Sequence, residues 1–228
     1  MSELTSVATD AAVEGVVFDL DGTLVDSRRD IVHAVEVALT SHGVAPPAPN
    51  VIATFVGDGA RLLVARALAL PLDEPRVDPV LETYLAYYEA HPVEHTTLMP
   101  GALSALDALD QMPLAVCTNK PRRIADLVLS RLGLTDRFAV VVGGGDTARG
   151  KPDPEPLVAA SERLGTPAAR LAMVGDGVQD VACGRAAGAY TVAVLGGFFD
   201  AEALRRARPN VLISNLSELP PLLVARGV

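Results

Sequence analysis

Short apolar segments rich in β-branched residues alternate with helical patterns along most of this chain, and this alternation limits its fold more than any other feature. Six segments have the composition of strands: residues 13–18, 114–117, 138–142, 171–174, 190–194 and 211–213. Three segments between them carry apolar residues at helical spacing: residues 124–132, 156–164 and 181–187. Strands that alternate with single helices form βαβ units, so we predict an α/β fold whose doubly wound parallel sheet has helices on both faces.

One interval interrupts this alternation. Between Asp26 and about Pro100 we find no strand pattern and three helical ones: residues 31–41, 50–70 and 77–90. Prolines lie between these helical patterns. We therefore predict a Rossmann-like core formed by residues 1–25 and 97–228, and a helical domain of residues 26–96 that is inserted after the first strand.

The first strand leads directly into two acids. Asp19 and Asp21 follow it, and Gly22 comes next as a turn residue. At a strand end, residues two positions apart point to the same side. At a separation of about 4 Å and an effective dielectric constant near 20, the two carboxylates repel each other by about 4 kcal/mol. A hard divalent cation removes this cost and prepares the pair for phosphate chemistry, so we expect such a cation here.

Polar residues also follow the next three predicted strands. Thr118 comes directly after the second strand, and Lys151 closes the glycine-rich loop after the third. Asp176 follows the fourth strand, with Asp180 one helical turn later. Because open parallel sheets bind ligands at the carboxyl ends of their strands, we expect these side chains to converge with Asp19 on one edge.

Each of these residues has a simpler explanation when it is taken alone. The Asp-Gly pairs at 21–22 and 176–177 are common in turns. Thr118 could cap the helix that follows it, and Asp180 could cap another. Lys151 could be a solvated loop residue. The catalytic interpretation rests on the combination, since all of these explanations would have to hold together for it to fail.

Four segments carry these residues, and in chain order they are Asp19-Leu20-Asp21-Gly22-Thr23, Thr118-Asn119-Lys120-Pro121, Lys151-Pro152 and Gly175-Asp176-Gly177-Val178-Gln179-Asp180. Together with the patterns between them, they resemble the four motifs of the haloacid dehalogenase-like phosphohydrolase superfamily over nearly the whole chain. The resemblance implies a Mg²⁺-dependent phosphatase that hydrolyses small phosphate monoesters through an aspartyl-phosphate intermediate.

The resemblance also implies a role for each catalytic residue. Asp19 would attack phosphorus as the nucleophile. Asp21 would protonate the departing alkoxide and later take a proton from water. Thr118 would donate a hydrogen bond to a phosphoryl oxygen, and Lys151 would offset the negative charge of nucleophile and phosphate.

The same resemblance implies the metal ligands. Mg²⁺ would be bound by the carboxylates of Asp19 and Asp176 and by the backbone carbonyl of Asp21. Asp180 would lie behind these ligands and orient Lys151 or a metal-bound water. Positioning and charge neutralisation carry most of a phosphoryl transfer, which is why several cations and donors are expected at one phosphate.

The inserted helices resemble the cap domain of the first subclass of this superfamily, which closes over the site and contacts the substrate. The segment Phe55-Val56-Gly57-Asp58-Gly59-Ala60-Arg61 resembles the cap of phosphoglycolate phosphatases, so we expect 2-phosphoglycolate as the substrate. Gly57 would bring backbone amides close to an anion, and Arg61 would bind the substrate carboxylate. The alternative, in which Gly57 shapes a helix start and Arg61 is solvated or ion-paired, stays open. Gly22 and Asn119 complete the expected substrate-binding set.

Other functions occur in the same superfamily. A dehalogenase needs no metal and has no use for a second acid, so Asp21, Asp176 and Asp180 argue against it. A phosphonate hydrolase uses a cap lysine to form a Schiff base, and residues 26–99 contain no lysine. A phosphosugar mutase, a pyrophosphatase and a non-enzymatic phosphate-binding regulatory module stay open as alternatives. The complete set of nucleophile, acid, cation and metal ligand favours an enzyme.

Charge and hydropathy limit the partners of this chain. A formal net charge of −9 over 228 residues disfavours binding to nucleic acid and to anionic lipid. No uninterrupted apolar run reaches the ~18 residues that span a bilayer. The first fifteen residues have no basic cluster followed by an apolar stretch, so we predict no signal peptide and a cytoplasmic protein. We expect a small phosphorylated metabolite as its partner and a monomer or homodimer as its state.

The two cysteines, Cys117 and Cys183, have neither the spacing of metal ligands nor that of a disulfide framework. Each lies in an apolar segment. We therefore expect both to behave as small buried hydrophobic residues.

Overall fold

The structure, a computed structural model, describes residues 12–224. The prediction that the first fifteen residues form no signal peptide falls mostly on residues outside this range. Within residues 12–224, no helix is both long enough and apolar enough to cross a membrane. Cys117 and Cys183 are both buried, as predicted.

A sheet of six parallel strands forms the centre of the fold. The strands are β1 (Gly15–Phe18), β4 (Leu114–Pro121), β5 (Val140–Gly144), β6 (Leu171–Gly175), β7 (Tyr190–Val194) and β8 (Val211–Ile213). Their order in space is β5-β4-β1-β6-β7-β8, and every neighbouring pair is parallel. The chain therefore winds outward from β1 in both directions, which confirms the predicted doubly wound α/β fold.

The strands form where the sequence has short continuous apolar runs. In β1, the side chains of Val16, Val17 and Phe18 are completely buried. A parallel sheet is covered by helices on both faces, so its central strands are apolar on both sides rather than alternating. This is why the central strands could be recognised from composition alone.

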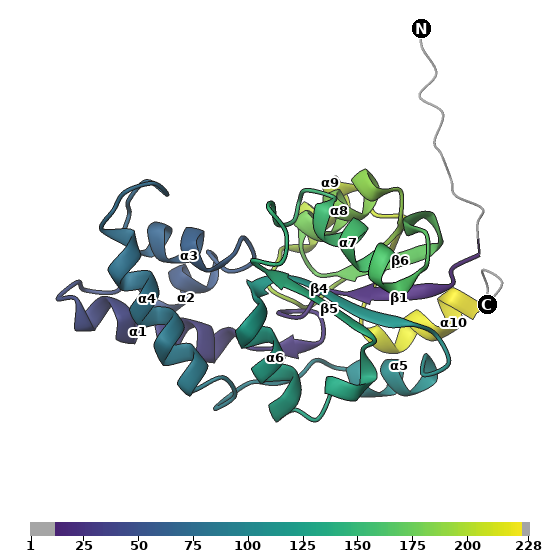
Figure 1. The fold of residues 1–228 in the computed structure, drawn as a ribbon, viewed down its shortest axis with the longest axis horizontal. Coiled ribbons are helices and arrows are strands. Elements are labelled where there is room, and N and C mark those ends of the chain that lie inside the picture. The colour runs from purple at the N-terminus through teal and green to yellow at the C-terminus, as the bar shows by residue number, and fades with distance from the viewer. Residues whose placement is uncertain (1–11, 225–228) are drawn as a thin grey trace, which may run out of the picture.

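Helices cover both faces of the sheet, as Figure 1 shows. One face carries α7 (Glu155–Leu164), α8 (Val178–Ala187) and α9 (Ala201–Ala207), and the other carries α5 (Ala102–Ala108), α6 (Arg122–Arg131) and α10 (Leu219–Val224). Three short 3₁₀ helices complete the core: η1 (Thr135–Arg137), η2 (Ala168–Arg170) and η3 (Leu216–Glu218). The sequence analysis predicted α6, α7 and α8 but missed α5, α9 and α10.

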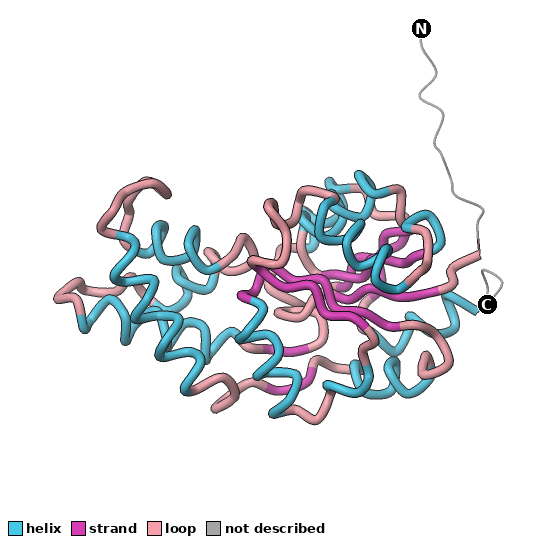
Figure 2. Tube along the Cα trace, in the orientation of Figure 1, coloured by secondary structure: helices cyan, strands magenta, loops and turns pink. Residues whose placement is uncertain are grey.

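The remaining helices form a separate group beyond the edge of the sheet where the parallel strands end (Figures 1 and 2). They are α1 (Arg28–Ser41), α2 (Pro49–Ala53), α3 (Ala60–Ala67) and α4 (Val77–Ala90), and we call them the helical unit. Within it, α1 packs against α4 and α2, and α3 packs against α4. The predicted insert between the first and second core strands is therefore helical.

Two details of the insert differ from the prediction. The single helix expected over residues 50–70 is wrong, because α2 ends at Ala53 and α3 begins at Ala60. Gly57 and Gly59 between them have φ angles of +121° and +92°, which an α-helix does not tolerate. The expectation of no strand between Asp26 and about Pro100 is also wrong, since β3 (Thr97–Leu98) pairs with β2 (Val25–Asp26) as a short antiparallel ribbon. This ribbon lies at both crossings between the sheet and the helical unit.

We predict that helix α5, which the sequence analysis missed, is held by one apolar face. Leu106 on α5 is fully buried, whereas Leu103 on the same helix is 48% exposed. Leu106→Ala should lower the free energy of unfolding by about 2–5 kcal/mol, because it removes buried methyl groups and leaves a cavity. Leu103→Ala is the matched control and should change it by less than about 0.5 kcal/mol. Urea denaturation of both variants measures the difference, and equal losses would contradict the packing described here.

Candidate active site

The predicted site residues of the core lie where three neighbouring strands end. Asp19 follows β1, Thr118 lies near the end of β4, and Asp176 follows β6. All three side chains are buried. The strand order reverses at β1, so the loops after β4 and β6 leave in opposite directions and open a site between them.

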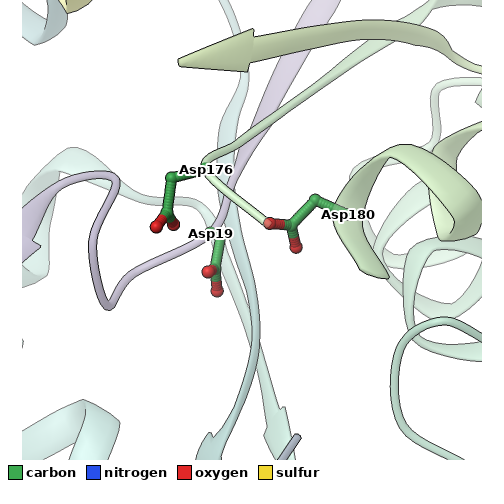
Figure 3. A group of neighbouring side chains, drawn as sticks. All are labelled: Asp19, Asp176 and Asp180. Atoms are coloured by element: carbon green, nitrogen blue, oxygen red, sulfur yellow. The ribbon is translucent and has the colours of Figure 1, made fainter. Parts of the chain in front are cut away.

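Three carboxylates meet at this point. Oxygen atoms of Asp19, Asp176 and Asp180 all lie within 4.8 Å of one another, and Figure 3 shows the three side chains next to one another. Burial raises the pKa of Asp19 to about 7, with the negative charge of Asp180 adding to the effect and Lys151 opposing it. Burial, together with the charges of Asp19 and Asp180, raises the pKa of Asp176 to about 8. The cluster therefore holds more negative charge than its surroundings compensate.

Lys151 supplies the one buried ammonium that contacts this cluster within the described residues. Its Nζ lies 2.7 Å from Asp19 Oδ1 and 2.6 Å from Asp180 Oδ1, and it donates a hydrogen bond to the Cys117 carbonyl at 2.7 Å. Burial alone would lower the pKa of Lys151, but the charges of Asp180 and Asp19 outweigh it and raise that pKa well above its usual value. The side chain therefore stays charged beside Asp19.

Asp180 is held on both of its oxygens. Oδ1 accepts from Lys151, and Oδ2 accepts from the backbone N–H of Gly177 at 2.9 Å, at the start of α8. With both oxygens engaged, Asp180 fixes the position of Lys151. Asp180 thus connects Lys151 to the start of α8.

Asp176 is fixed by two elements that lie far apart in the sequence. Its Oδ1 accepts from the hydroxyl of Thr23 at 3.0 Å, and its Oδ2 accepts from the backbone N–H of Phe198 at 2.6 Å. A Cβ atom added at Gly22 or at Gly197 would lie 2.3 Å from Asp176 Oδ2, so only glycine fits at either position. The turn after β1 thus packs directly against the side chain of Asp176.

The donor set fits a hard divalent cation. The three acids offer only oxygen atoms, and one nearby ammonium leaves them with excess negative charge. Mg²⁺ and Ca²⁺ prefer carboxylate and carbonyl oxygens, and they lower the cost of holding buried carboxylates together. Asp19, Asp176 and Asp180 together bring carboxylate oxygens close enough to one another to hold such an ion.

Asp21 contacts a group that the sequence analysis did not assign. Its Oδ1 accepts from the Ser27 hydroxyl, and both of its oxygens accept from Lys120 Nζ, at 2.8 and 3.1 Å. Lys120 also donates to the Tyr88 hydroxyl of α4 at 2.6 Å. A signal for Lys120 was available, since it stands two positions after Thr118 on β4 just as Asp21 stands two positions after Asp19.

Asn119 connects the sheet to the helical unit. Its Nδ2 donates to the carbonyls of Gly57 at 3.0 Å and Lys151 at 2.9 Å, and its Oδ1 accepts from the Lys151 backbone N–H at 2.8 Å. The structure thus brings Asn119 and Gly57 together at the site. All three of these contacts are to backbone groups of the protein, so Asn119 braces the loop that carries Lys151.

Arg61 is not brought to the site. Its guanidinium donates to the Leu72 carbonyl at 2.9 Å and forms an ion pair with Asp78 on α4. The side chain is 40% exposed, and Arg61 is not among the residues that line the cavity over Asp19. Of the two possibilities left open for Arg61, the structure contains the ion pair.

A small cavity of about 30 Å³ lies between the sheet and the helical unit. Polar residues line its core side: Asp19, Asp21, Thr118, Asn119 and Lys120. Mostly apolar residues of the helical unit line the other side, among them Ile31, Val56, Leu63 and Tyr84. The volume is roughly that of one water molecule. The helical unit therefore lies closed over Asp19 and Asp21.

Comparisons with known proteins agree with this geometry. The family model of haloacid dehalogenase-like hydrolases matches residues 16–194. The chain is 36% identical to a phosphoglycolate phosphatase of Agrobacterium fabrum over 217 residues, which are 93% of each chain. It is also 36% identical to an N-acetylmuramic acid 6-phosphate phosphatase of Pseudomonas aeruginosa over 192 residues, 83% of this chain and 85% of that one. A crystal structure of a predicted phosphoglycolate phosphatase from Haemophilus somnus shares the fold, with a TM-score of 0.85 and 24% identity over 95% of this chain and 99% of that chain.

We predict that Asp176 makes the metal-free protein less stable as the pH rises. An acid whose pKa is raised in the folded state is preferentially neutral there, so the free energy of unfolding falls between its usual pKa near 4 and its raised pKa of about 8. From pH 6 to pH 9 this single group should contribute a loss of up to about 2–3 kcal/mol. Asp176→Asn should remove that part of the loss.

Thermal denaturation of both proteins in a metal chelator at pH 6 and pH 9 tests this prediction. All other titrating groups are shared, so the difference between the two pH-dependent losses reports Asp176 together with its electrostatic coupling to Asp19. A variant that loses as much stability as the original chain between these pH values would show that Asp176 is already ionised at pH 6.

Proposed function

The chain belongs to the haloacid dehalogenase-like hydrolases and is a phosphoric monoester hydrolase, and from this we propose that it hydrolyses 2-phosphoglycolate in a Mg²⁺-dependent reaction with Asp19 as the nucleophile. One observation carries the mechanistic part of the proposal. Asp19 is a buried carboxylate at the end of β1 whose Oδ1 lies 2.7 Å from the ammonium of Lys151 and whose side chain faces Asp176. A nucleophile must approach an anionic phosphate here, and the adjacent cation lowers the repulsion between them.

In the proposed first step, an Asp19 carboxylate oxygen forms a bond to phosphorus while the bond from phosphorus to the ester oxygen breaks. Asp21 gives its proton to the departing alkoxide. Lys151 offsets charge on Asp19 and on the phosphoryl group, and the Thr118 hydroxyl donates to a phosphoryl oxygen. Mg²⁺, when bound by the Asp19 and Asp176 carboxylates with the Asp21 backbone carbonyl, would neutralise charge that spreads over the phosphoryl oxygens.

In the second step, Asp21 takes a proton from a water molecule, and the resulting hydroxide attacks the phosphorus of the aspartyl phosphate. The bond between phosphorus and the Asp19 oxygen breaks, and the carboxylate is regenerated as phosphate leaves. Asp180 serves this cycle by holding Lys151 in place through the contact at 2.6 Å.

We assign residues 26–96 to a cap domain and residues 1–25 and 97–228 to the catalytic core. Two hydrogen bonds place the proposed cap against the site of the core: Asn119 donates to the Gly57 carbonyl, and Lys120 donates to the Tyr88 hydroxyl. A cavity of about 30 Å³ cannot admit a phosphate ester, so the cap must open for the substrate and close again for chemistry. Closure excludes water while the aspartyl phosphate forms.

The relatives support a phosphorylated carboxylic acid as the substrate. The Agrobacterium fabrum relative is named for phosphoglycolate and the Pseudomonas aeruginosa relative for N-acetylmuramic acid 6-phosphate, and both compounds are acids. We favour the smaller acid because the closed cap leaves little room around Asp21. N-acetylmuramic acid 6-phosphate is the second candidate. We further propose a cytoplasmic location and a monomeric or homodimeric state.

The test is phosphate release from 2-phosphoglycolate and from N-acetylmuramic acid 6-phosphate by the purified protein with Mg²⁺. Asp19→Asn should lower kcat by more than about 10⁴-fold, because loss of a covalent nucleophile costs more than loss of one donor. Thr118→Ala, which removes one donor, should lower kcat by about 10²–10³-fold and serves for comparison. A chelator should abolish release, and added Mg²⁺ should restore it. Turnover by Asp19→Asn at the original rate would rule out the proposed nucleophile.

A further inference from the structure

Lys120 is a buried cation for which the proposed mechanism has no use. It lies on β4, and its side chain is only 2% exposed. Among the residues that line the cavity over Asp19, Lys120 is the only one with a cationic side chain. A buried ammonium is costly unless it is paired, so its position at a substrate cavity calls for an anionic partner.

In the closed structure that partner is Asp21. The ammonium of Lys120 meets three acceptors, the two oxygens of Asp21 at 2.8 and 3.1 Å and the Tyr88 hydroxyl at 2.6 Å. Tyr88 is buried on α4, and burial raises the pKa of its phenol well above the usual value, so the hydroxyl is a neutral acceptor. Lys120 thus links Asp21, the proposed general acid and base of the core, to Tyr88 of the cap.

The contact with Asp21 fixes where Lys120 lies relative to a bound substrate. Asp21 must reach the ester oxygen in order to protonate it. A group within hydrogen-bond distance of Asp21 is therefore close to the carbon atom that carries the ester oxygen. It lies beside the substituent on that carbon. In a phosphorylated 2-hydroxy acid, that substituent is the carboxylate.

The other nearby cations are already engaged. Lys151 contacts Asp19 and Asp180 at 2.7 and 2.6 Å and serves the phosphoryl group. Arg61 is paired with Asp78 on the outer side of the cap. A substrate that brings a carboxylate as well as a phosphate into this cavity therefore meets one cation that the phosphoryl chemistry does not occupy, and that cation is Lys120.

We propose that Lys120 is the residue that selects substrates with a carboxylate on the carbon next to the phosphate ester oxygen, an inference that rests on the proposed roles of Asp19 and Asp21. The substrate carboxylate takes the place of the longer contact, the one to Asp21 Oδ2 at 3.1 Å. This exchange binds the substrate and at the same time frees one Asp21 oxygen to face the ester oxygen. A phosphate ester without the carboxylate leaves Asp21 tied to Lys120 and turns over slowly.

The experiment compares 2-phosphoglycolate with ethyl phosphate, which has the same carbon skeleton without the carboxylate. The original chain should prefer 2-phosphoglycolate in kcat/KM. Lys120→Met keeps the length of the side chain but removes its charge, and it should lower kcat/KM for 2-phosphoglycolate about 30- to 100-fold, the loss expected for a charged hydrogen bond. For ethyl phosphate the loss should be less than about fivefold on the same scale, so the preference collapses.

The matched control is Arg123→Met. Arg123 also joins the core to α4, through an ion pair with Glu89 at 2.9 Å, but it is 78% exposed and lies away from the cavity. It should leave the ratio between the two substrates unchanged. Lys120→Arg keeps a positive charge and should retain most of the preference, which provides a second measurement should the methionine variant fold poorly.

The outcomes separate this inference from the proposed function. An original chain with no preference for 2-phosphoglycolate over ethyl phosphate would overturn the proposed substrate and this inference together. A clear preference that survives in Lys120→Met, or equal losses for both substrates, would overturn only the inference and leave Lys120 as a residue that positions Asp21. Loss of the preference in folded Lys120→Arg would likewise show that the positive charge is not what reads the substrate.

Discussion

The burial of three carboxylates around a single lysine is the constraint on which the rest of this structure depends. Asp19, Asp176 and Asp180 come from two strand ends and the first turn of α8, and each must be compensated because buried charges without partners are strongly unfavourable. Lys151 and the backbone N–H groups of Phe198 and Gly177 provide part of that compensation. The remaining negative charge is what a bound divalent cation would offset. The same three buried carboxylates therefore provide the chemistry of the site and cause its electrostatic cost.

Much of the core could be predicted from the sequence because its signals are local. Continuous apolar runs such as Val16 to Phe18 indicated buried parallel strands, and the polar residue after each run indicated the site. The helices that were missed are short or carry weak signals. Helix α5 has seven residues, and α10 begins with Leu219 followed by two prolines. These helices are stabilised by packing against the rest of the core, and a short stretch of sequence carries no information about that packing.

Tertiary context also explains two other differences from the prediction, one in the insert and one in the core. Apolar spacing continues across residues 50–70, so periodicity alone favoured one helix, but the backbone at Gly57 and Gly59 turns toward the core instead. There Gly57 accepts a hydrogen bond from Asn119. In the same way, the prediction ended the second core strand at residue 117, where the apolar run stops. Strand β4 continues to Pro121 because Thr118 and Lys120 find partners inside the fold.

The contrast between Arg61 and Lys120 shows what sequence patterns cannot decide. Both are cations close to glycine-rich or motif segments, and the resemblance of residues 55–61 to a cap segment singled out Arg61 as a candidate. Which one faces the cavity depends on neighbours from another helix, α4. Its Asp78 holds Arg61 at the surface, and its Tyr88 receives Lys120 in the interior. The proposed recognition of the substrate therefore lies on strand β4 of the sheet and not on the helical unit.

The ribbon of β2 and β3 has a consequence for how the cap can open. The two chain crossings are not independent tethers, because Val25 pairs with Leu98 and Asp26 with Thr97. Because the two segments are paired, any movement of the helical unit relative to the sheet must either bend the ribbon as a whole or break its pairs. In the proposed closure of the cap, the intact ribbon guides Tyr88 and Gly57 back to their contacts with Lys120 and Asn119. Four paired residues at the two chain crossings thus set how the helical unit is attached to the sheet.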